Sequence, residues 1–178
     1  CPDAVRTVGG AGHEIGCHTL QHESMGDPLV DIPPKPVLPE EVANRLTRAT
    51  NLIESIAGTR PVSFRAPRGW VSNEMMVTLD QLGYRADSSY MCWYHKEHFL
   101  PYHPSADDWR KPGNLGILEV PLFCDPVVLT GAEVDRYVDQ WPVLRMRGGE
   151  ALAKMALDVA EMLWAQDKPA LACIYLHP

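Results

Sequence analysis

Two histidines four positions apart, His18 and His22, are the residues whose spacing most directly indicates chemistry. Imidazole nitrogens are common zinc ligands, and two of them can bind one ion when they lie within ~4 Å of each other. A straight strand would separate these positions by about 13 Å, at ~3.3 Å per residue. We therefore expect His18 at the end of a strand, with the residues up to His22 forming a helical turn on which positions i and i+4 share a face.

The known zinc motifs on helices do not match this stretch. HExxH requires a glutamate after the first histidine, where Thr19 stands. HxxEH requires one before the second histidine, where Gln21 stands. The pair alone is therefore equally compatible with ordinary surface or core histidines.

Arg65, in the stretch FRAPRG, and His177, in the closing IYLHP, each follow a short apolar run that is typical of a strand. Strand ends are where parallel α/β folds place their functional side chains. Arg65 could hold a carboxylate through a bidentate pair or form a structural salt bridge. His177 could present a functional group at the rim of the fold, whereas a lone histidine in such a place is more often structural.

Apolar runs that alternate with longer amphipathic segments predict βα units. The segments with helical spacing are 2–7, 39–57, 72–83 and 150–166. The segments expected to form strands are 13–18, 62–65, 84–88, 117–123 and 171–176. The proline-rich stretch 27–39 and the aromatic segment 90–113 are expected to lack regular structure.

Composition disfavours two kinds of partner. The chain carries 16 basic and 23 acidic residues, a formal charge of −7, and no dense cluster of lysine and arginine. We therefore expect no nucleic acid partner. No apolar run approaches the ~20 residues that cross a bilayer, so we expect no membrane partner either.

The five cysteines are scattered along the chain and form no CxxC pair. This pattern favours free thiols in a reducing compartment, and we expect the protein in the cytoplasm. The chain starts at Cys1 without an initiator methionine, which leaves open whether a signal peptide precedes it.

Taken together, GHEIGCHTLQH, FRAPRG, LGYRADSS and the closing YLHP resemble the polysaccharide deacetylase family, also called the NodB homology or carbohydrate esterase 4 group. The resemblance covers nearly the whole chain in order. HTLQH matches the family's metal motif, FRAP its Arg-x-Pro motif and YLHP its closing Leu-His. Stretches such as FRAPRGW and LPYHPSADDW are most similar to the peptidoglycan deacetylase-like and allantoinase-like branch.

The resemblance implies an α/β fold, namely a distorted, incomplete (β/α) barrel of the NodB type that lacks its first strand, in a single domain over residues 1–178. It implies a divalent metal, usually Zn²⁺, held by one aspartate and two histidines, here His18 and His22. Water activated by the metal would attack an acyl carbonyl with an aspartate as general base. Arg65 would orient that base, and His177 would protonate the leaving nitrogen.

The chain departs from the family in its acidic residues. The family's first motif, Thr-Phe-Asp-Asp-Gly, is absent, and we expect it upstream of Cys1 in a chain truncated at its N-terminus, or else lost in a degenerate relative. Asp87 is the candidate for the aspartate that orients the closing histidine, with Asp107 and Asp108 as rivals.

Pro67 and Trp70, which follow Arg65, are candidate substrate contacts, although core packing explains Trp70 equally well.

The expected function is metal-dependent hydrolysis of carbon–nitrogen bonds other than peptide bonds, with an N-acetylated carbohydrate such as peptidoglycan or a chitin-type sugar as substrate. The alternative enzyme is an allantoinase-like hydrolase of a small amide, a cyclic imide or a ureide. A third alternative is a binding module that keeps the fold without catalysis. The sequence leaves open whether the chain forms a homo-oligomer.

Overall fold

The structure is a computed structural model that describes residues 1–29, 36–130 and 138–176. The chain forms two compact units. The first comprises Cys1–Ser89 and Tyr102–Glu119, and the second comprises Tyr90–Pro101 and Val120–Pro178. The single domain predicted over residues 1–178 stays a prediction.

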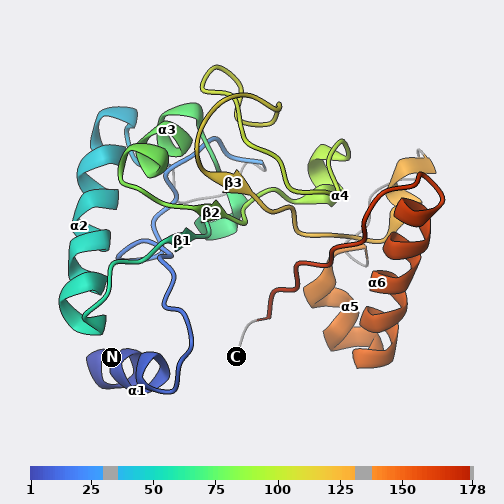
Figure 1. Cartoon of the computed structure of the whole chain (residues 1–178), viewed down its shortest axis with the longest axis horizontal. Coiled ribbons are helices and arrows are strands. Elements are labelled where there is room, and N and C mark those ends of the chain that lie inside the picture. Colours follow the sequence, from blue (N-terminus) through green and yellow to red (C-terminus); the bar gives the residue numbers. More distant parts are fainter. Residues whose placement is uncertain (30–35, 131–137, 177–178) are drawn as a thin grey trace. The chain divides into compact units, whose positions relative to one another are not determined.

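A small parallel sheet lies in the first unit, with β1 (Ser63–Phe64), β2 (Ala86–Asp87) and β3 (Leu118–Glu119) in the order β1-β2-β3 (Figure 1). Each strand falls within a segment predicted to be extended, although each is only two residues long. Phe64 pairs with Asp87, which pairs in turn with Glu119. Two acidic residues therefore end neighbouring strands side by side.

The helix α2 (Pro39–Ala57) has the bounds that the apolar spacing predicts. Val42, Leu46 and Ala49 recur at helical spacing and are buried. The helix begins at a proline, whose missing N–H costs nothing in the first turn. It ends at Gly58, which has a φ of 74° that favours glycine.

Two further helices belong to this unit, α1 (Pro2–Gly10) and α3 (Asn73–Gln81), and α3 packs against α2 (Figure 1). Ser72 caps α3, since its hydroxyl accepts a hydrogen bond from the Met75 N–H at 3.2 Å. Because α3 lies between β1 and β2 in the chain, these strands can run parallel.

Two segments predicted as strands make only isolated bridges. In the first unit, Cys17 bridges Phe64, and in the second, Cys173 bridges Leu122. Both bridges are parallel, so these segments keep the predicted direction without forming a full ladder.

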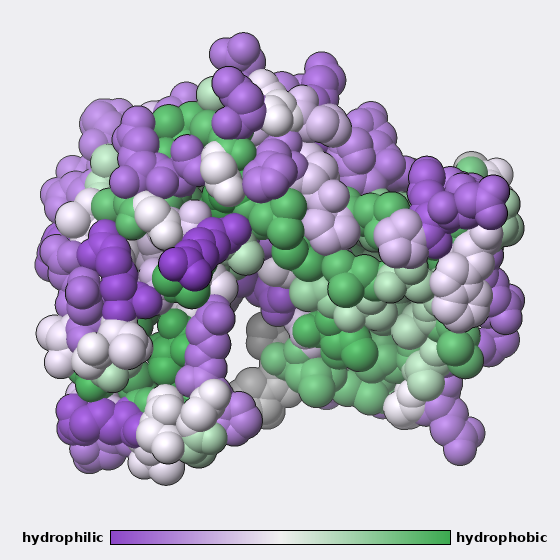
Figure 2. All heavy atoms as spheres, in the orientation of Figure 1, coloured by the Kyte–Doolittle hydropathy of each residue, from purple (hydrophilic) through white to green (hydrophobic). Residues whose placement is uncertain are grey.

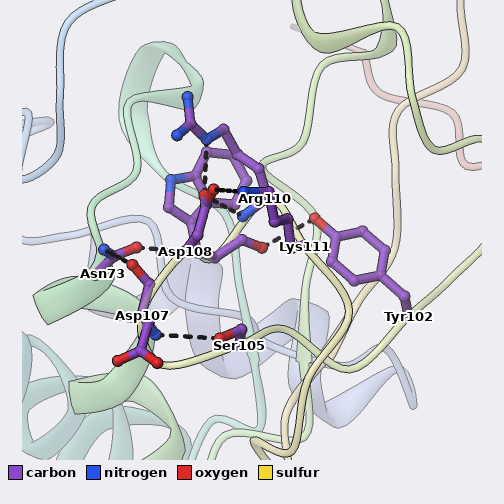
Figure 3. A network of polar contacts seen from close by, with 8 residues as sticks. Asn73, Tyr102, Ser105, Asp107, Asp108, Arg110 and Lys111 are labelled. Atoms are coloured by element: carbon purple, nitrogen blue, oxygen red, sulfur yellow. Dashed lines mark hydrogen bonds and ion pairs between the residues drawn. The ribbon is translucent and has the colours of Figure 1, made fainter.

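The aromatic segment 90–113, predicted to lack regular structure, contains one short helix, α4 (Cys92–His95), and an ordered loop at residues 102–113. The Asn73 side chain fixes this loop, because its amide donates to the Asp107 carbonyl at 2.6 Å and its oxygen accepts from the Trp109 N–H at 2.9 Å. The Tyr102 hydroxyl donates to the Trp109 carbonyl at 3.1 Å (Figure 3). The loop is therefore held at the start of α3.

Asp108 lies in the same loop and accepts from Arg110 at 2.9 Å and Lys111 at 3.1 Å (Figure 3). The hydrogen bond from Arg110, followed by that from Lys111, lowers the pKa of Asp108 to about 2 against the opposing effect of burial. Its carboxylate is thus engaged by surface cations.

In the second unit, α5 (Gln140–Arg147) packs against α6 (Gly149–Trp164), and the short 3-10 helix η2 (Pro126–Thr130) packs against α6. Sequence spacing predicts α6 but not α5, which contains Pro142 and only two buried residues. Gln140 on α5 is fully buried, and its amide donates to the carbonyls of Phe123 and Cys173, each at 2.9 Å. This side chain therefore ties the segment around Cys173 to the unit.

Figure 2 shows that apolar side chains gather on the visible surface of the second unit. Its large exposed apolar residues include Met146, Leu157, Trp164, Leu171, Ile174 and Leu176. Among the described helices, none is long and apolar enough to cross a membrane.

Candidate metal site

The rings of His18 and His22 lie together at the surface of the first unit, with centroids 4.9 Å apart and planes at 70°. Tetrahedral coordination with bonds of ~2.0 to 2.1 Å places two ligating imidazole rings about 5 Å apart. The two rings therefore have a separation that suits one shared metal ion.

The turn that brings these rings together is not the predicted helical turn. Thr19 has a φ of 65° and His22 a φ of 57°, both in the left-handed region. This conformation is costly for a β-branched residue such as threonine. Backbone strain of this kind is concentrated at functional sites.

The hydrogen bond that His18 makes defines its tautomer. Its Nδ1 lies 2.7 Å from the carbonyl oxygen of Arg65, and a carbonyl can only accept. Nδ1 therefore carries the proton, which leaves the lone pair on Nε2. Histidines that bind metals commonly donate their other N–H to a backbone carbonyl in this way.

Arg68 fixes the other end of the turn. Its Nη1 donates to the Ser24 hydroxyl at 2.8 Å and to the His22 carbonyl at 3.4 Å, and its guanidinium lies 5.9 Å from the centre of the Trp70 ring. Arg68 itself has a φ of 60°. Arg68 was not predicted as a site residue, although its position within FRAPRG is a signal that could have indicated it.

Gly26 lets the chain leave this turn close to the residues after FRAPRG. A Cβ at this position would lie 2.3 Å from backbone atoms of Val71, so no larger residue fits without moving the backbone. The Asp27 N–H donates to the Val71 carbonyl at 3.2 Å beside it. The turn is thus held at both ends by the segment around residues 65–71.

Glu23 closes the same turn, since its carboxylate accepts from the Gln21 N–H at 2.6 Å. Burial raises the pKa of Glu23, but hydrogen bonds from the backbone N–H groups of Glu23 and Gln21, together with the charge of Arg45, lower it further than burial raises it. The net effect is a lowered pKa, so Glu23 is a carboxylate that braces the histidine turn.

The guanidinium of Arg65 donates to Ser88, through Nε to the carbonyl at 2.8 Å and through Nη2 to the hydroxyl at 2.7 Å. Its backbone carbonyl and its side chain therefore bind different segments, those of His18 and Ser88. The predicted role of Arg65 in orienting a general base stays a prediction.

Asp87 is fully buried beside a residue that the sequence did not indicate, Glu119, which is fully buried as well. Burial raises the pKa of Asp87, and hydrogen bonds with Glu119 and Ser89 oppose that rise, together with the charge of Arg65. A glutamate within the apolar run ILEVPL was a signal for a buried acid in this strand.

Pro67 and Trp70, the candidate substrate contacts, are both buried, and Trp70 is only 1% exposed. The core-packing alternative therefore fits Trp70. Contact with a substrate stays a prediction for both residues.

The closing histidine, His177, lies outside the described residues. The pairing of Asp87 with this histidine therefore stays a prediction. Its rivals Asp107 and Asp108 belong to the loop that Asn73 holds.

Of the one aspartate and two histidines expected to bind the metal, only the two histidines lie together in the described residues. Within residues 1–29, 36–130 and 138–176, no group of three or more histidine, cysteine, aspartate or glutamate side chains could hold a metal ion. The geometry of His18 and His22 fits two nitrogen ligands, and the described residues do not supply the carboxylate.

Comparison with solved structures defines the fold. PuuE allantoinase and a protein of Pseudomonas aeruginosa PAO1 described as a probable polysaccharide deacetylase are each 17% identical to this chain, with TM-scores of 0.60 and 0.59. Each likeness covers 99% of this chain and 50% of the other. The predicted fold class is confirmed: the chain has an α/β fold, an incomplete (β/α) barrel of the NodB type.

Comparison of sequences supports the resemblance to a family. The family described as polysaccharide deacetylase matches residues 1–86. A peptidoglycan deacetylase-like protein of Gibberella zeae, FGM2, is 26% identical over 133 residues, which are 67% of this chain and 37% of that protein. The predicted resemblance to this family is confirmed over residues 1–86, which are just under half of the chain. The chain spans well under half of the length of this curated relative and half of that of the two solved structures.

Proposed function

We propose that the protein is a metal-dependent hydrolase that removes the acyl group from an N-acetylated carbohydrate. The observation that carries this proposal is the histidine pair, with rings 4.9 Å apart and the Nδ1 of His18 bonded to a backbone carbonyl. The match of residues 1–86 to the polysaccharide deacetylase family and the name of the peptidoglycan deacetylase-like relative support a carbohydrate substrate.

In this proposal His18 and His22 are two of three protein ligands of a divalent ion, with Zn²⁺ as the expected metal. Such an ion lowers the pKa of water and polarises the acyl carbonyl, both of which a poor electrophile such as an amide requires. The family resemblance implies an aspartate as the third ligand, and we propose that it comes from outside the described residues. Both His18 and His22 are exposed to solvent, so an ion from solution can reach them.

The remaining roles follow the motif match. His177 would protonate the leaving nitrogen, because an amine leaves only when it is protonated. Arg65 is tied to Ser88 and adds positive charge near Asp87, and we propose that it orients the acidic side of the site.

The compartment and partners are also proposals. No disulfide joins the cysteines, all five of which lie in the described residues, and this supports a reducing compartment such as the cytoplasm. The proposed partner is the N-acetylated carbohydrate or small amide itself, without nucleic acid or membrane.

The test is hydrolysis by the full-length protein of N-acetylglucosamine oligomers, followed by acetate release with and without a chelator and added Zn²⁺. We expect release that the chelator stops and that His18→Ala reduces by about a hundredfold or more, since the metal would lose a ligand. His13→Ala, which changes an exposed histidine outside the pair, is the matched control and should leave release unchanged. Unchanged release in His18→Ala would refute the proposed site.

The same preparation distinguishes the alternative functions. Ring opening of a cyclic imide or ureide without acetate release would favour the allantoinase-like alternative, in line with the shared fold. Carbohydrate binding without either reaction would favour a binding module.

A further inference from the structure

A continuous chain of hydrogen bonds runs from His18 into the core of the first unit. His18 Nδ1 donates to the carbonyl of Arg65 at 2.7 Å. That carbonyl belongs to the same peptide group as the N–H of Ala66, which donates to the Ser89 hydroxyl at 2.8 Å. The Ser89 hydroxyl donates in turn to Asp87 Oδ1 at 2.8 Å.

All three bonds point in the same direction. Each group accepts from the His18 side and donates toward Asp87. Hydrogen bonds arranged in this way polarise one another, and the effect is strongest in a buried setting of low dielectric. Ala66, Ser89 and Asp87 have at most 2% exposure, so water does not compete along the inner part of the chain.

The inner end of the chain is a pair of acids. Asp87 and Glu119 are register partners on β2 and β3, and both are fully buried. Burial raises the pKa of Asp87, as expected where two buried carboxyl groups lie side by side and only one of them is ionised. Glu119 also accepts from the Ser89 N–H at 3.1 Å, so both acids hold the same serine.

The pair therefore shares one proton and keeps one negative charge. That charge lies at the accepting end of a chain whose first donor is the His18 ring. A negative acceptor draws the proton of each donor toward it and so leaves more electron density on the opposite nitrogen of the imidazole.

We propose that Asp87 and Glu119, acting through Ser89 and the Arg65–Ala66 peptide, position His18 and strengthen its binding of a divalent cation. Asp87, Glu119 and Ser89 are positioning residues that do not touch the metal. The hydrogen-bonded chain stands on its own geometry, whereas its use in metal binding rests on the proposed function.

The chain itself is tested by nitrogen NMR on the protein labelled with ¹⁵N-histidine, at a pH where His18 is neutral. We expect the Nδ1–H tautomer in the wild type and a changed Nδ1 resonance in Ser89→Ala, which interrupts the chain. Asp87→Asn keeps an acceptor for Ser89 but confines the negative charge to Glu119, so it should shift the resonance in the same direction by less.

Ser72→Ala is the matched control, because it also deletes a serine hydroxyl with little exposure but one that caps α3 and lies outside the chain. It should leave the His18 resonance unchanged. A His18 resonance that stays the same in a folded Ser89→Ala variant and in Asp87→Asn would overturn the proposal, as would the Nε2–H tautomer in the wild type.

The second readout is Zn²⁺ affinity, measured by titration of the same variants. Direct outer partners of a metal ligand contribute about 10- to 100-fold, so we expect a more remote serine to contribute about 3- to 10-fold. Equal affinities in Ser89→Ala, Ser72→Ala and the wild type would overturn the role in metal binding. If His18→Ala also bound Zn²⁺ like the wild type, the proposed function would fail, whereas the NMR result on the chain would be unaffected.

Discussion

One backbone carbonyl, that of Arg65, decides which nitrogen of His18 can bind a metal. Because the carbonyl takes the Nδ1 proton, the lone pair lies on Nε2. The Arg65 side chain meanwhile holds Ser88. The FRAP motif therefore contributes both its backbone and its guanidinium to the site, which residue type alone does not reveal.

Arg68 is expected to contribute to metal binding through the His22 side of the turn. Arg68→Met removes the donors to the His22 carbonyl and the Ser24 hydroxyl but keeps an apolar stem of similar length. Zn²⁺ titration should show affinity about tenfold weaker than in the wild type, the low end of what an outer partner contributes.

Arg60→Met is the control for Arg68→Met, since Arg60 binds Glu54 and the Leu82 carbonyl away from the turn. It should leave Zn²⁺ affinity unchanged. Equal affinities in the two variants would contradict the role given to Arg68.

The buried acid pair predicts stability that depends on pH. Glu119 and the charged Arg65 are neighbours of Asp87, whose pKa is raised above its ordinary value of 3.8. Between 3.8 and the raised pKa, folding therefore takes up a proton. This contribution is complete below 3.8 and is lost as the pH rises through the raised pKa. In that window the free energy of unfolding should fall by about 1.4 kcal/mol per pH unit for one proton.

Asp87→Asn should remove this slope, because its amide can donate to the Glu119 carboxylate without a proton being taken up. Urea denaturation of both proteins across the pH range measures the difference. Parallel pH profiles would show that the pair does not share a proton.

At the scale of elements, the histidine turn shows what sequence spacing can and cannot predict. Because a straight strand would hold His18 and His22 too far apart to bind one ion, we predicted a turn between them, and the two rings do lie 4.9 Å apart. The type of turn depends on Glu23, Arg68 and the close approach at Gly26, which come from separate segments. Periodicity carries no information about such long-range contacts, so the predicted helical turn is wrong.

Helices were more predictable than strands. The apolar spacing of α2 gives its bounds, because a helix is defined by contacts within one segment. The segments at 13–18 and 171–176 were predicted as strands, yet each makes only one bridge. A strand depends on its neighbour, and α5 was missed because only Gln140 and Val143 are buried.

The ordered loop at residues 102–113 should depend on Asn73. Asn73→Ala removes two hydrogen bonds to the loop backbone and should lower the free energy of unfolding by about 1 to 3 kcal/mol. Hydrogen exchange should become faster within the loop. Asn51→Ala, at an exposed position of α2, is the control. An equal loss of unfolding free energy in both variants would contradict the role given to Asn73.

At the scale of the whole molecule, the apolar surface of the second unit predicts self-association of the isolated chain. Leu157 and Trp164 on α6 are 58% and 59% exposed. Exposed apolar surface of this kind favours association. Sedimentation velocity should show the average mass rising with concentration.

Leu157→Lys and Trp164→Lys should reduce that association, whereas Val8→Lys, at an exposed apolar position of α1, should not. A wild-type chain that stays monomeric at every concentration would contradict this prediction.

The central claim, that His18 and His22 bind one divalent ion, is tested most directly by Zn²⁺ titration of the chain and its histidine variants. The account predicts one ion bound per chain, about a hundredfold or more weaker binding in His18→Ala and in His22→Ala, and unchanged binding in His13→Ala. Binding that is equally strong in all three variants would contradict it.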